Sequence, residues 1–321
     1  MNKNESNDIK MKKNNLNFLV TVLLFLLLVS GVHAQEYTIL RIKPSITDTS
    51  ITNWDIPHVI KYDPTIQNNK LLLFLQGTRG TTMRLPDAFL NTALEKGYKV
   101  IAISYITDPG ISGICIGDNL RKNNNCAYDF RRYRIYGDNA FPLIKDQPQD
   151  AIVNRVSKLL IYLIKNDPHG NWEQYIDMQT GKIKWDKIVI SGQSQGGGMA
   201  QFIGQHENVA KVISFSGGWD YRDAETKTIA DWYTQPCVTP DSNWFAVYHV
   251  KEAAAEVLKK ICNTLPIPKN QIFAVDGPLR NISVTRGKNP YHGEGLTNII
   301  YKPIWQTMLG SGIINKKTYY H

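Results

Sequence analysis

The sequence predicts an α/β fold, with a mostly parallel central sheet that helices cover on both faces. Short apolar runs rich in β-branched residues alternate along the chain with longer segments in which apolar residues recur at helical spacing. Strands joined through helices pair in parallel by right-handed crossovers, and their runs are apolar throughout because both faces are buried. One strand-to-helix junction also carries a Gly-x-Ser-x-Gly pattern. In such sheets the functional groups gather at the carboxyl ends of the strands.

Each element has its own signal. The run LLLFL is apolar throughout and turn residues follow it, KVIAISY is a second buried strand, and AIVNRVSKLLIYLIKN repeats apolar residues three and four apart. A strand ends at the glycine-flanked serine, and a segment with the composition of a helix begins directly after it. Further along, three apolar runs predict strands, and one more helix lies between the last two of them. The predicted strands are 71–75, 99–105, 187–190, 212–215, 244–250 and 271–275, and the predicted helices are 85–96, 151–166, 199–203 and 253–261.

The first 34 residues resemble an export signal. Lys10, Lys12 and Lys13 precede an apolar run at 18–29, and the small-residue stretch SGVHA follows at 30–34. We expect cleavage after Ala34, which leaves 35–321 as one α/β domain in a secreted or periplasmic protein. An uncleaved membrane anchor is the alternative, but the run is shorter than the roughly 20 apolar residues that span a bilayer. We therefore expect no stable membrane anchor after cleavage.

The chain is moderately basic. Its formal net charge is +9, and removal of the signal, which contains four Lys and two acidic residues, leaves +7. The surplus is spread along the sequence, with one dense cluster at Arg131, Arg132 and Arg134. A solvated surface or a contact with acidic polysaccharide explains this cluster as well as nucleic acid would, and no nucleic-acid-binding module is recognisable. We expect no nucleic-acid partner.

Four cysteines are present, Cys115, Cys126, Cys237 and Cys262. An even number in an exported chain indicates disulfides, although the sequence allows three pairings. We expect the local pairs, Cys115 with Cys126 and Cys237 with Cys262, because they close the shorter loops. No Cys-x-x-Cys motif or histidine at ligand spacing accompanies the cysteines, so we expect no metal site and no cofactor.

The most informative stretch is GQSQG at 192–196, with Ser194 at its centre. A serine on a sharp strand-to-helix turn has its hydroxyl lifted above the sheet edge, and the flanking glycines let strand and helix approach closely. The pattern therefore predicts a nucleophile. A simple glycine-rich turn or a phosphate-binding loop is the alternative, but the strand before it and the helix after it are the context that the nucleophile motif requires.

Two backbone N–H groups are candidates for stabilising an oxyanion. The N–H of Gln195, the residue after the nucleophile, is the first. The second comes from QGTRG at 76–80, which follows the predicted strand 71–75; we favour the N–H of Thr78, with Gly77 next. An ordinary glycine turn is the alternative for this loop.

A serine nucleophile needs a base, and histidine is the usual one. In this fold the chain order is serine, acid, histidine. His206 lies one helix beyond the serine, His249 lies inside a predicted strand and His321 ends the chain. His292, in the loop NPYHGEG after the last predicted strand, is the expected base.

Three carboxylates compete for the acid position. Glu252 follows the strand 244–250 by two residues, Asp220 follows the strand after the serine helix, and Asp276 ends the last strand. We rank Glu252 first, Asp220 second and Asp276 third. A structural ion pair, with Lys251 or Arg222, is the alternative for each.

From 71 to 298 the chain resembles a little-characterised branch of exported serine esterase-like proteins in the α/β-hydrolase superfamily. The similar blocks are LLLFLQGTRGT, GYKVIAISY, the cysteine-bearing block from ISGIC through the second cysteine to RRYRIYG, VNRVSKLLIYL, IVISGQSQGGGMAQFIGQH, VISFSGGWD and HGEGLTN. The resemblance implies an α/β-hydrolase fold, with Ser194 as nucleophile and His292 as base. Two positions depart from the common pattern, since Gln193 stands where histidine is more frequent and Glu252 where aspartate is more usual.

Together these observations predict an exported serine hydrolase that cleaves a carboxylic ester in a small molecule or a polymer. A peptidase or amidase with the same triad is the nearest alternative, and a non-catalytic binding protein on the same fold is the other. Residues 110–149, rich in turns, are expected to cover the active-site end of the sheet.

Overall fold

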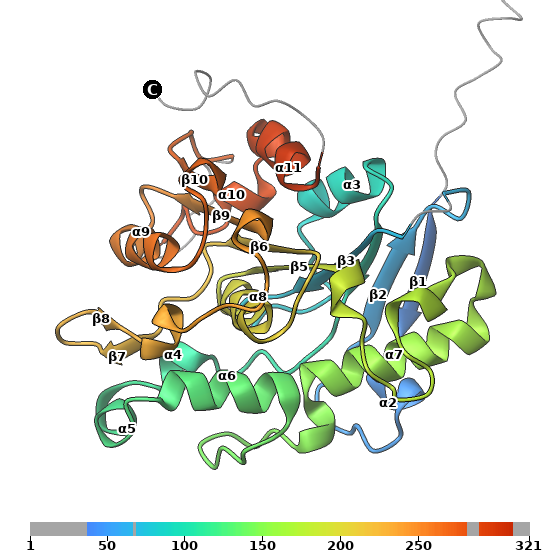
Figure 1. The fold of residues 1–321 in the computed structure, drawn as a ribbon, viewed down its shortest axis with the longest axis horizontal. Helices are drawn as coiled ribbons and strands as arrows, with labels where there is room; N and C mark the ends of the chain where they lie inside the picture. The colour runs from blue at the N-terminus through green and yellow to red at the C-terminus, as the bar shows by residue number, and fades with distance from the viewer. Residues whose placement is uncertain (1–36, 67–68, 281–288, 311–321) are drawn as a thin grey trace, which may run out of the picture. The chain divides into compact units, whose positions relative to one another are not determined.

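The computed structural model describes residues 37–66, 69–280 and 289–310 (Figure 1). The predicted signal at 1–34, with its cleavage site, and His321 lie outside the described residues. Within the described ranges, every helix is too short or too polar to cross a lipid bilayer.

The described part of the chain contains one eight-stranded sheet and one two-stranded hairpin. The strands of the large sheet lie in the order β1-β2-β4-β3-β5-β6-β9-β10. β1 pairs antiparallel with β2, and β2 with β4, whereas every pairing from β4 to β10 is parallel. The strands are β1 (Thr38–Ile42), β2 (His58–Tyr62), β3 (Leu71–Leu75), β4 (Lys99–Ala102), β5 (Ile188–Gln193), β6 (Lys211–Phe215), β9 (Trp244–His249) and β10 (Ile272–Val275), and the hairpin is β7 (Tyr221–Asp223) with β8 (Thr228–Ile229).

Helices cover both faces of the sheet, as the sequence predicts (Figure 1). Alternate residues along one strand join opposite layers: Leu71 and Leu73 pack with α6 to α9, while Leu72 packs with α3 and α11. The core is therefore two apolar layers separated by the sheet. The helices are α2 (Pro44–Thr47), α3 (Asp87–Glu95), α4 (Ile111–Ile114), α5 (Gly117–Lys122), α6 (Cys126–Tyr136), α7 (Ile152–Asn166), α8 (Gln195–His206), α9 (Ala255–Thr264), α10 (Glu294–Thr297) and α11 (Lys302–Met308).

All ten predicted elements are present, with ends that differ by a few residues. The predicted strand 99–105 is shorter in the structure, where β4 ends at Ala102, because its pairing with β2 and β3 ends there. Strands β1 and β2 were absent from the prediction. Their sequences TILRI and HVIKY mix polar and apolar residues, as expected for the antiparallel edge of a sheet.

The segment 110–149 is more helical than its turn-rich sequence indicates, since it contains α4, α5 and α6. A disulfide joins Cys115, just after α4, to Cys126 at the start of α6, as predicted. The predicted pair of Cys237 and Cys262 is wrong, because both are free thiols. Cys262 faces the core from α9, whereas Cys237 is half-buried in a loop. Burial raises the pKa of the Cys237 thiol to about 11 and that of Cys262 to about 12.

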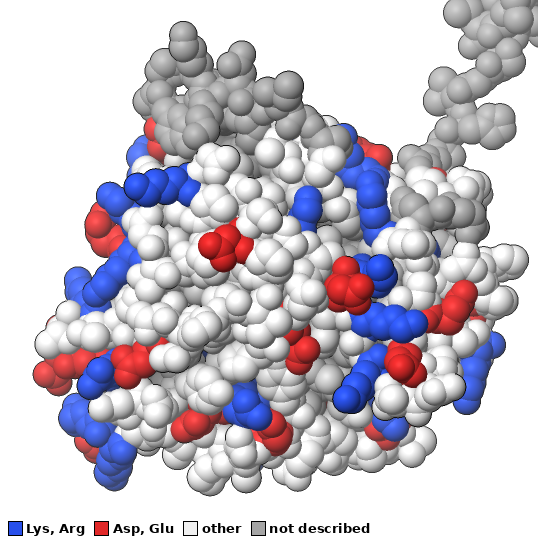
Figure 2. Space-filling model, viewed as in Figure 1, with Lys and Arg blue, Asp and Glu red and all other residues white. Residues whose placement is uncertain are grey.

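The arginine cluster on α6 is not a basic surface, which corrects the prediction. Arg131 and Arg134 point into the protein and are almost fully buried, in ion pairs with Asp220 and Asp146. Residues three apart share a helix face, so both side chains follow the core side of α6. Arg132 pairs with an acidic neighbour nearer the surface. Figure 2 shows positive and negative side chains interspersed over the visible face.

Candidate active site

Ser194 lies in a strained turn between β5 and α8. Its backbone has φ 56° and ψ −120°, a region that non-glycine residues rarely adopt. A Cβ atom at Gly196 would lie 2.1 Å from the Leu75 carbonyl oxygen, and one at Gly192 would lie 2.3 Å from the Gly196 backbone. Both flanking glycines are therefore required for β3, β5 and α8 to approach so closely. The Ser194 N–H donates to the Phe215 carbonyl at 2.9 Å, which ties the turn to β6.

Glu252 and His292 form a hydrogen-bonded pair, although 40 residues separate them in the sequence. His292 Nδ1 lies 2.7 Å from Glu252 Oε2. Because a carboxylate only accepts, Nδ1 carries the proton and Nε2 is left free to accept one. The Glu252 side chain is 1 % exposed and that of His292 is 23 % exposed. The imidazole can therefore meet a substrate while its partner is shielded from water.

Two further donors fix the Glu252 carboxylate. Oε1 accepts from Ser216 Oγ at 2.5 Å and from the His249 N–H at 2.9 Å. Three hydrogen bonds to one buried carboxylate restrict its rotation and hold Oε2 against the imidazole. His292 is held as well: its carbonyl lies 3.5 Å from Gln193 Nε2, and the Trp219 ring meets its imidazole edge-on at 5.4 Å between centroids. The pair thus sits next to the Ser194 turn.

The other two acid candidates have different surroundings. Asp220 forms a buried two-bond ion pair with Arg131, at 2.5 and 2.7 Å, and accepts from Trp232 Nε1 at 3.0 Å. This pair joins α6 to the loop after β6. Asp276 follows β10 near Tyr301, where burial and the charges of Glu294 and Asp276 raise the pKa of the tyrosine to about 12. The structure places Glu252, the first-ranked candidate, against His292.

Two other histidines that follow Ser194 in the sequence, His206 and His249, are held in structural contacts. His206 stacks on Phe202 at 4.2 Å between ring centroids, and its Nδ1–H donates to the Phe202 carbonyl. His249 is fully buried, donates from Nε2 to the Gly277 carbonyl and accepts the Lys251 N–H at Nδ1. Both ring nitrogens of His249 and the Nδ1 of His206 are therefore engaged by the backbone.

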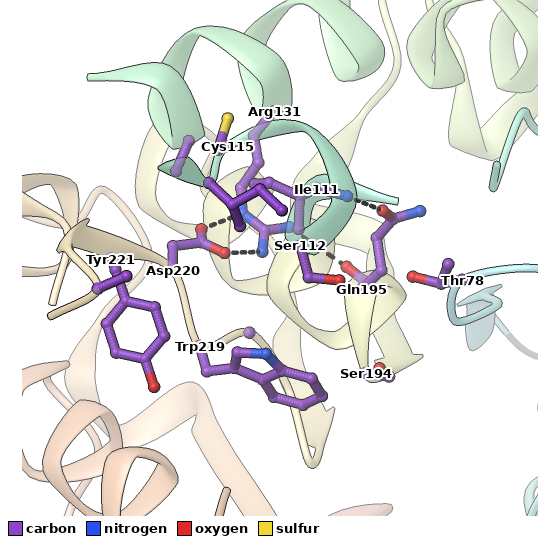
Figure 3. A pocket seen from close by; sticks show the side chains of 14 residues that line it. Thr78, Ile111, Ser112, Cys115, Arg131, Ser194, Gln195, Trp219, Asp220 and Tyr221 are labelled. Carbon is purple, nitrogen blue, oxygen red and sulfur yellow. Dashed lines mark hydrogen bonds and ion pairs between the residues drawn. The ribbon is translucent and has the colours of Figure 1, made fainter. Parts of the chain in front are cut away.

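Thr78 and Gln195, the expected oxyanion donors, lie beside the same cavity as Ser194 (Figure 3). The Gln195 side chain is buried: Oε1 accepts the Ile111 N–H at 2.9 Å and Nε2 donates to the Thr107 carbonyl at 3.1 Å. The Thr78 side chain packs against Gly110, where a Cβ atom would lie 2.6 Å from it. The segment 107–111 therefore contacts both candidate donor residues.

Two cavities flank the Ser194 turn. The first, which we call the serine cavity, has a volume of about 140 Å³. The second, the histidine cavity, has about 340 Å³ and includes Gly77, Gln193 and His292 in its lining. The serine cavity is lined by Thr78, Ile111, Ser112, Cys115, Ile116, Ala127, Arg131, Ser194, Gln195, Gly218, Trp219, Asp220, Tyr221 and Ala224. As predicted, the segment after 110 covers this end of the sheet.

Sequence reasoning missed the supporting residues of this site. Ser216 and Trp219 lie in SFSGGWD, directly after β6, at the same sheet edge as Ser194. Two glycines after a buried strand are a signal for a backbone that approaches another element closely, and they could have directed attention to this loop. Among the described residues, no group of three His, Cys, Asp or Glu side chains is arranged to hold a metal ion.

No protein-family model and no curated protein matches the sequence. The structure is similar to solved hydrolases at low identity. An S-formylglutathione hydrolase from Staphylococcus aureus is 12% identical with a TM-score of 0.47, over 86% of this chain and 98% of that one. An α/β hydrolase from a deep-sea metagenome library of the Medee basin is 13% identical with a TM-score of 0.43, over 86% and 100%. An acylaminoacyl peptidase from Pyrococcus horikoshii is 11% identical with a TM-score of 0.44, over 91% and 45%.

The fold class is assigned from the order and direction of the strands. Two antiparallel strands lead into six parallel ones, and the serine turn lies between β5 and α8 at the carboxyl end of a central strand. The chain has an α/β-hydrolase fold.

Proposed function

We propose that this chain is a serine hydrolase that cleaves carboxylic esters. The observation that carries the proposal is the hydrogen-bonded Glu252–His292 pair, which Gln193 links to the turn where Ser194 is held at a positive φ. A nucleophile, a base and an orienting carboxylate are the three groups that acyl transfer to a hydroxyl requires. Here they come from three separate loops, all of which follow strands of the parallel sheet.

In the proposed reaction, Ser194 Oγ attacks the ester carbonyl carbon and His292 Nε2 takes the hydroxyl proton. Glu252 holds Nδ1–H and stabilises the imidazolium that forms. The N–H groups of Gln195 and Thr78 bind the oxyanion, and loss of one such donor typically costs about 3–4 kcal/mol of transition-state stabilisation. The imidazolium then protonates the leaving alcohol. Water attacks the acyl-enzyme by the same route, with His292 as base again, and releases the acid.

The test is covalent labelling of the purified mature protein with a fluorophosphonate. We expect one label on Ser194, and we expect Ser194→Ala to lose both the label and the turnover of p-nitrophenyl esters, since the triad serine carries most of the rate. Ser242→Ala is the matched control, because Ser242 is exposed and precedes β9 at the opposite sheet edge. Unchanged ester turnover in folded Ser194→Ala would rule the proposal out.

Substrate choice separates esterase from peptidase. A peptidase uses the same groups on an amide, so labelling alone does not distinguish the two. We expect p-nitrophenyl esters to be cleaved and unmodified peptides to be left intact. Cleavage of peptides at a rate comparable to that of the esters would show that the amidase alternative is correct.

We also propose that the chain is exported. The Cys115–Cys126 disulfide supports this, because such bonds persist in oxidising compartments. The protein recovered outside the cytoplasm should begin at Gln35, which N-terminal sequencing would show directly.

A further inference from the structure

We propose that the serine cavity holds the acyl half of the substrate and limits it to a short apolar chain or a single ring. The inference rests on the proposed ester hydrolysis and goes further, because it assigns each half of the ester to one of the two cavities.

The chemistry decides which half lies where. The acyl carbon must bond to Ser194 Oγ while its oxygen faces the N–H groups of Gln195 and Thr78, and these three residues all line the serine cavity. The alcohol oxygen must lie against the imidazole that protonates it. His292 lines the histidine cavity, together with Gly77 and Gln193. The acyl group therefore extends into the serine cavity and the alcohol toward the histidine cavity.

The size of the serine cavity limits the acyl group. Its volume is about 140 Å³, whereas the histidine cavity has about 340 Å³. An apolar protein cavity of about 150 Å³ accommodates one benzene molecule, so the acyl half has room for about six carbon atoms. Ile111 and Trp219 (Figure 3) give the lining apolar surface, which favours a hydrocarbon over a charged group. Ile116 adds to this surface.

An ion pair, a disulfide and an aromatic contact fix the positions of residues that line the serine cavity. Arg131 and Asp220, which form part of the lining, are held in an almost fully buried ion pair, and Arg131 Nη1 also donates to the Gln195 carbonyl at 3.3 Å. Cys115, in the wall, is bonded to Cys126 on α6. Trp219 fills the side nearest His292 and contacts its ring. A longer acyl chain would have to displace the ion pair, the disulfide-linked segment or Trp219, and such displacement is energetically unfavourable in a packed region.

Two substrate series test the assignment. In the first, p-nitrophenyl acetate, butyrate, hexanoate, octanoate and decanoate vary only the acyl half. In the second, the acetates of ethanol, hexanol and decanol vary only the alcohol. We expect kcat/KM to fall by about tenfold or more beyond hexanoate, and to change much less along the alcohol series. A flat acyl profile, or a steep fall only with alcohol length, would overturn the assignment.

Three variants locate the effect. Ile116 lines the cavity and is 51% exposed, so the variant Ile116→Ala should still fold. The smaller side chain enlarges the cavity, so the decrease in kcat/KM should begin at longer acyl chains. Ser112→Leu, also at an exposed lining position, should move it to shorter chains. Ile46→Ala on α2 is the matched control, since Ile46 is 57% exposed and is not part of the cavity lining. An unshifted profile in both lining variants contradicts the proposal. No hydrolysis and no label on Ser194 would instead reject ester hydrolysis itself.

Discussion

At the scale of single residues, Glu252 is the group on which the proposed chemistry depends most closely. Its carboxylate accepts from Ser216, His249 and His292 and is almost fully buried. Glu252→Gln keeps the size and removes the charge that stabilises the imidazolium. We expect kcat to fall by about 10² to 10⁴-fold, with little change in KM. Steady-state kinetics on protein with a native melting curve provides the measurement, and a near-normal kcat would contradict the assignment.

Asp220, the second-ranked acid, should respond in a different way. Asp220→Asn leaves the buried Arg131 without its charged partner, and breaking such a pair typically costs about 3–5 kcal/mol of folding free energy. Chemical denaturation should show this loss, while the fraction that remains folded keeps a pH–rate profile like that of the wild type. Asp276→Asn should change neither quantity much. A folded Asp220→Asn protein that is as inactive as Glu252→Gln would identify Asp220 as the acid instead.

At the scale of elements, the disulfide joins the end of α4 to the start of α6 across 11 positions of sequence. The double variant Cys115→Ser/Cys126→Ser removes this cross-link, so the unfolded chain gains conformational entropy and the folded state becomes less stable relative to it. We expect a loss of about 2–3 kcal/mol in the free energy of unfolding. Cys237→Ser is the matched control, because that half-buried thiol is free and should change stability little. Mass spectrometry without reductant should find Cys115 joined to Cys126 and two alkylated thiols; four alkylated thiols would contradict the structure.

Elements differ in how far the sequence predicts them, and burial accounts for part of the difference; β2 is buried, but its His58 and Lys61 interrupt the apolar pattern. β3, β5 and β9 are buried along nearly their whole length, so their sequences are apolar runs that identify them. β1 is half exposed, and its burial alternates, which leaves a weak signal. Ser194 and Glu252 were predictable as candidates for the same reason, since they follow β5 and β9, whereas His292 was identified by its place in the glycine-bordered loop after β10. Ser216, Trp219 and the buried role of Arg131 were not, because they depend on contacts between segments far apart in sequence.

At the scale of the whole molecule, His58 links stability to pH. It is completely buried in β2, and its Nδ1 accepts the Ser104 N–H at 2.9 Å. Burial, together with the charge of Arg155, lowers its pKa from 6.5 to about 3. The folded state therefore binds fewer protons than the unfolded state between these two values. Stability from this group is complete above pH 6.5 and decreases as the pH falls toward about 3.

The expected loss is roughly 2 kcal/mol as the pH falls from about 6.5 to about 5. His58→Asn keeps an acceptor for the Ser104 N–H without a proton to gain, so its stability should change much less over the same range. Urea titrations at several pH values measure both proteins. Parallel pH curves for the wild type and the variant would contradict this explanation.

The segment 107–111 has a consequence for how this protein could diversify. It packs against Thr78 through Gly110, binds the Gln195 side chain, and leads directly into the cavity wall at Ile111. A mutation in the segment 107–111 would change the reaction rate and the substrate preference together. Substitutions that alter substrate preference should therefore be rarely accepted at these positions. Ser112, Ile116 and Ala224 line the cavity from exposed positions outside this segment. Relatives that have acquired different acyl preferences should therefore vary at these three positions and keep the glycine at 110.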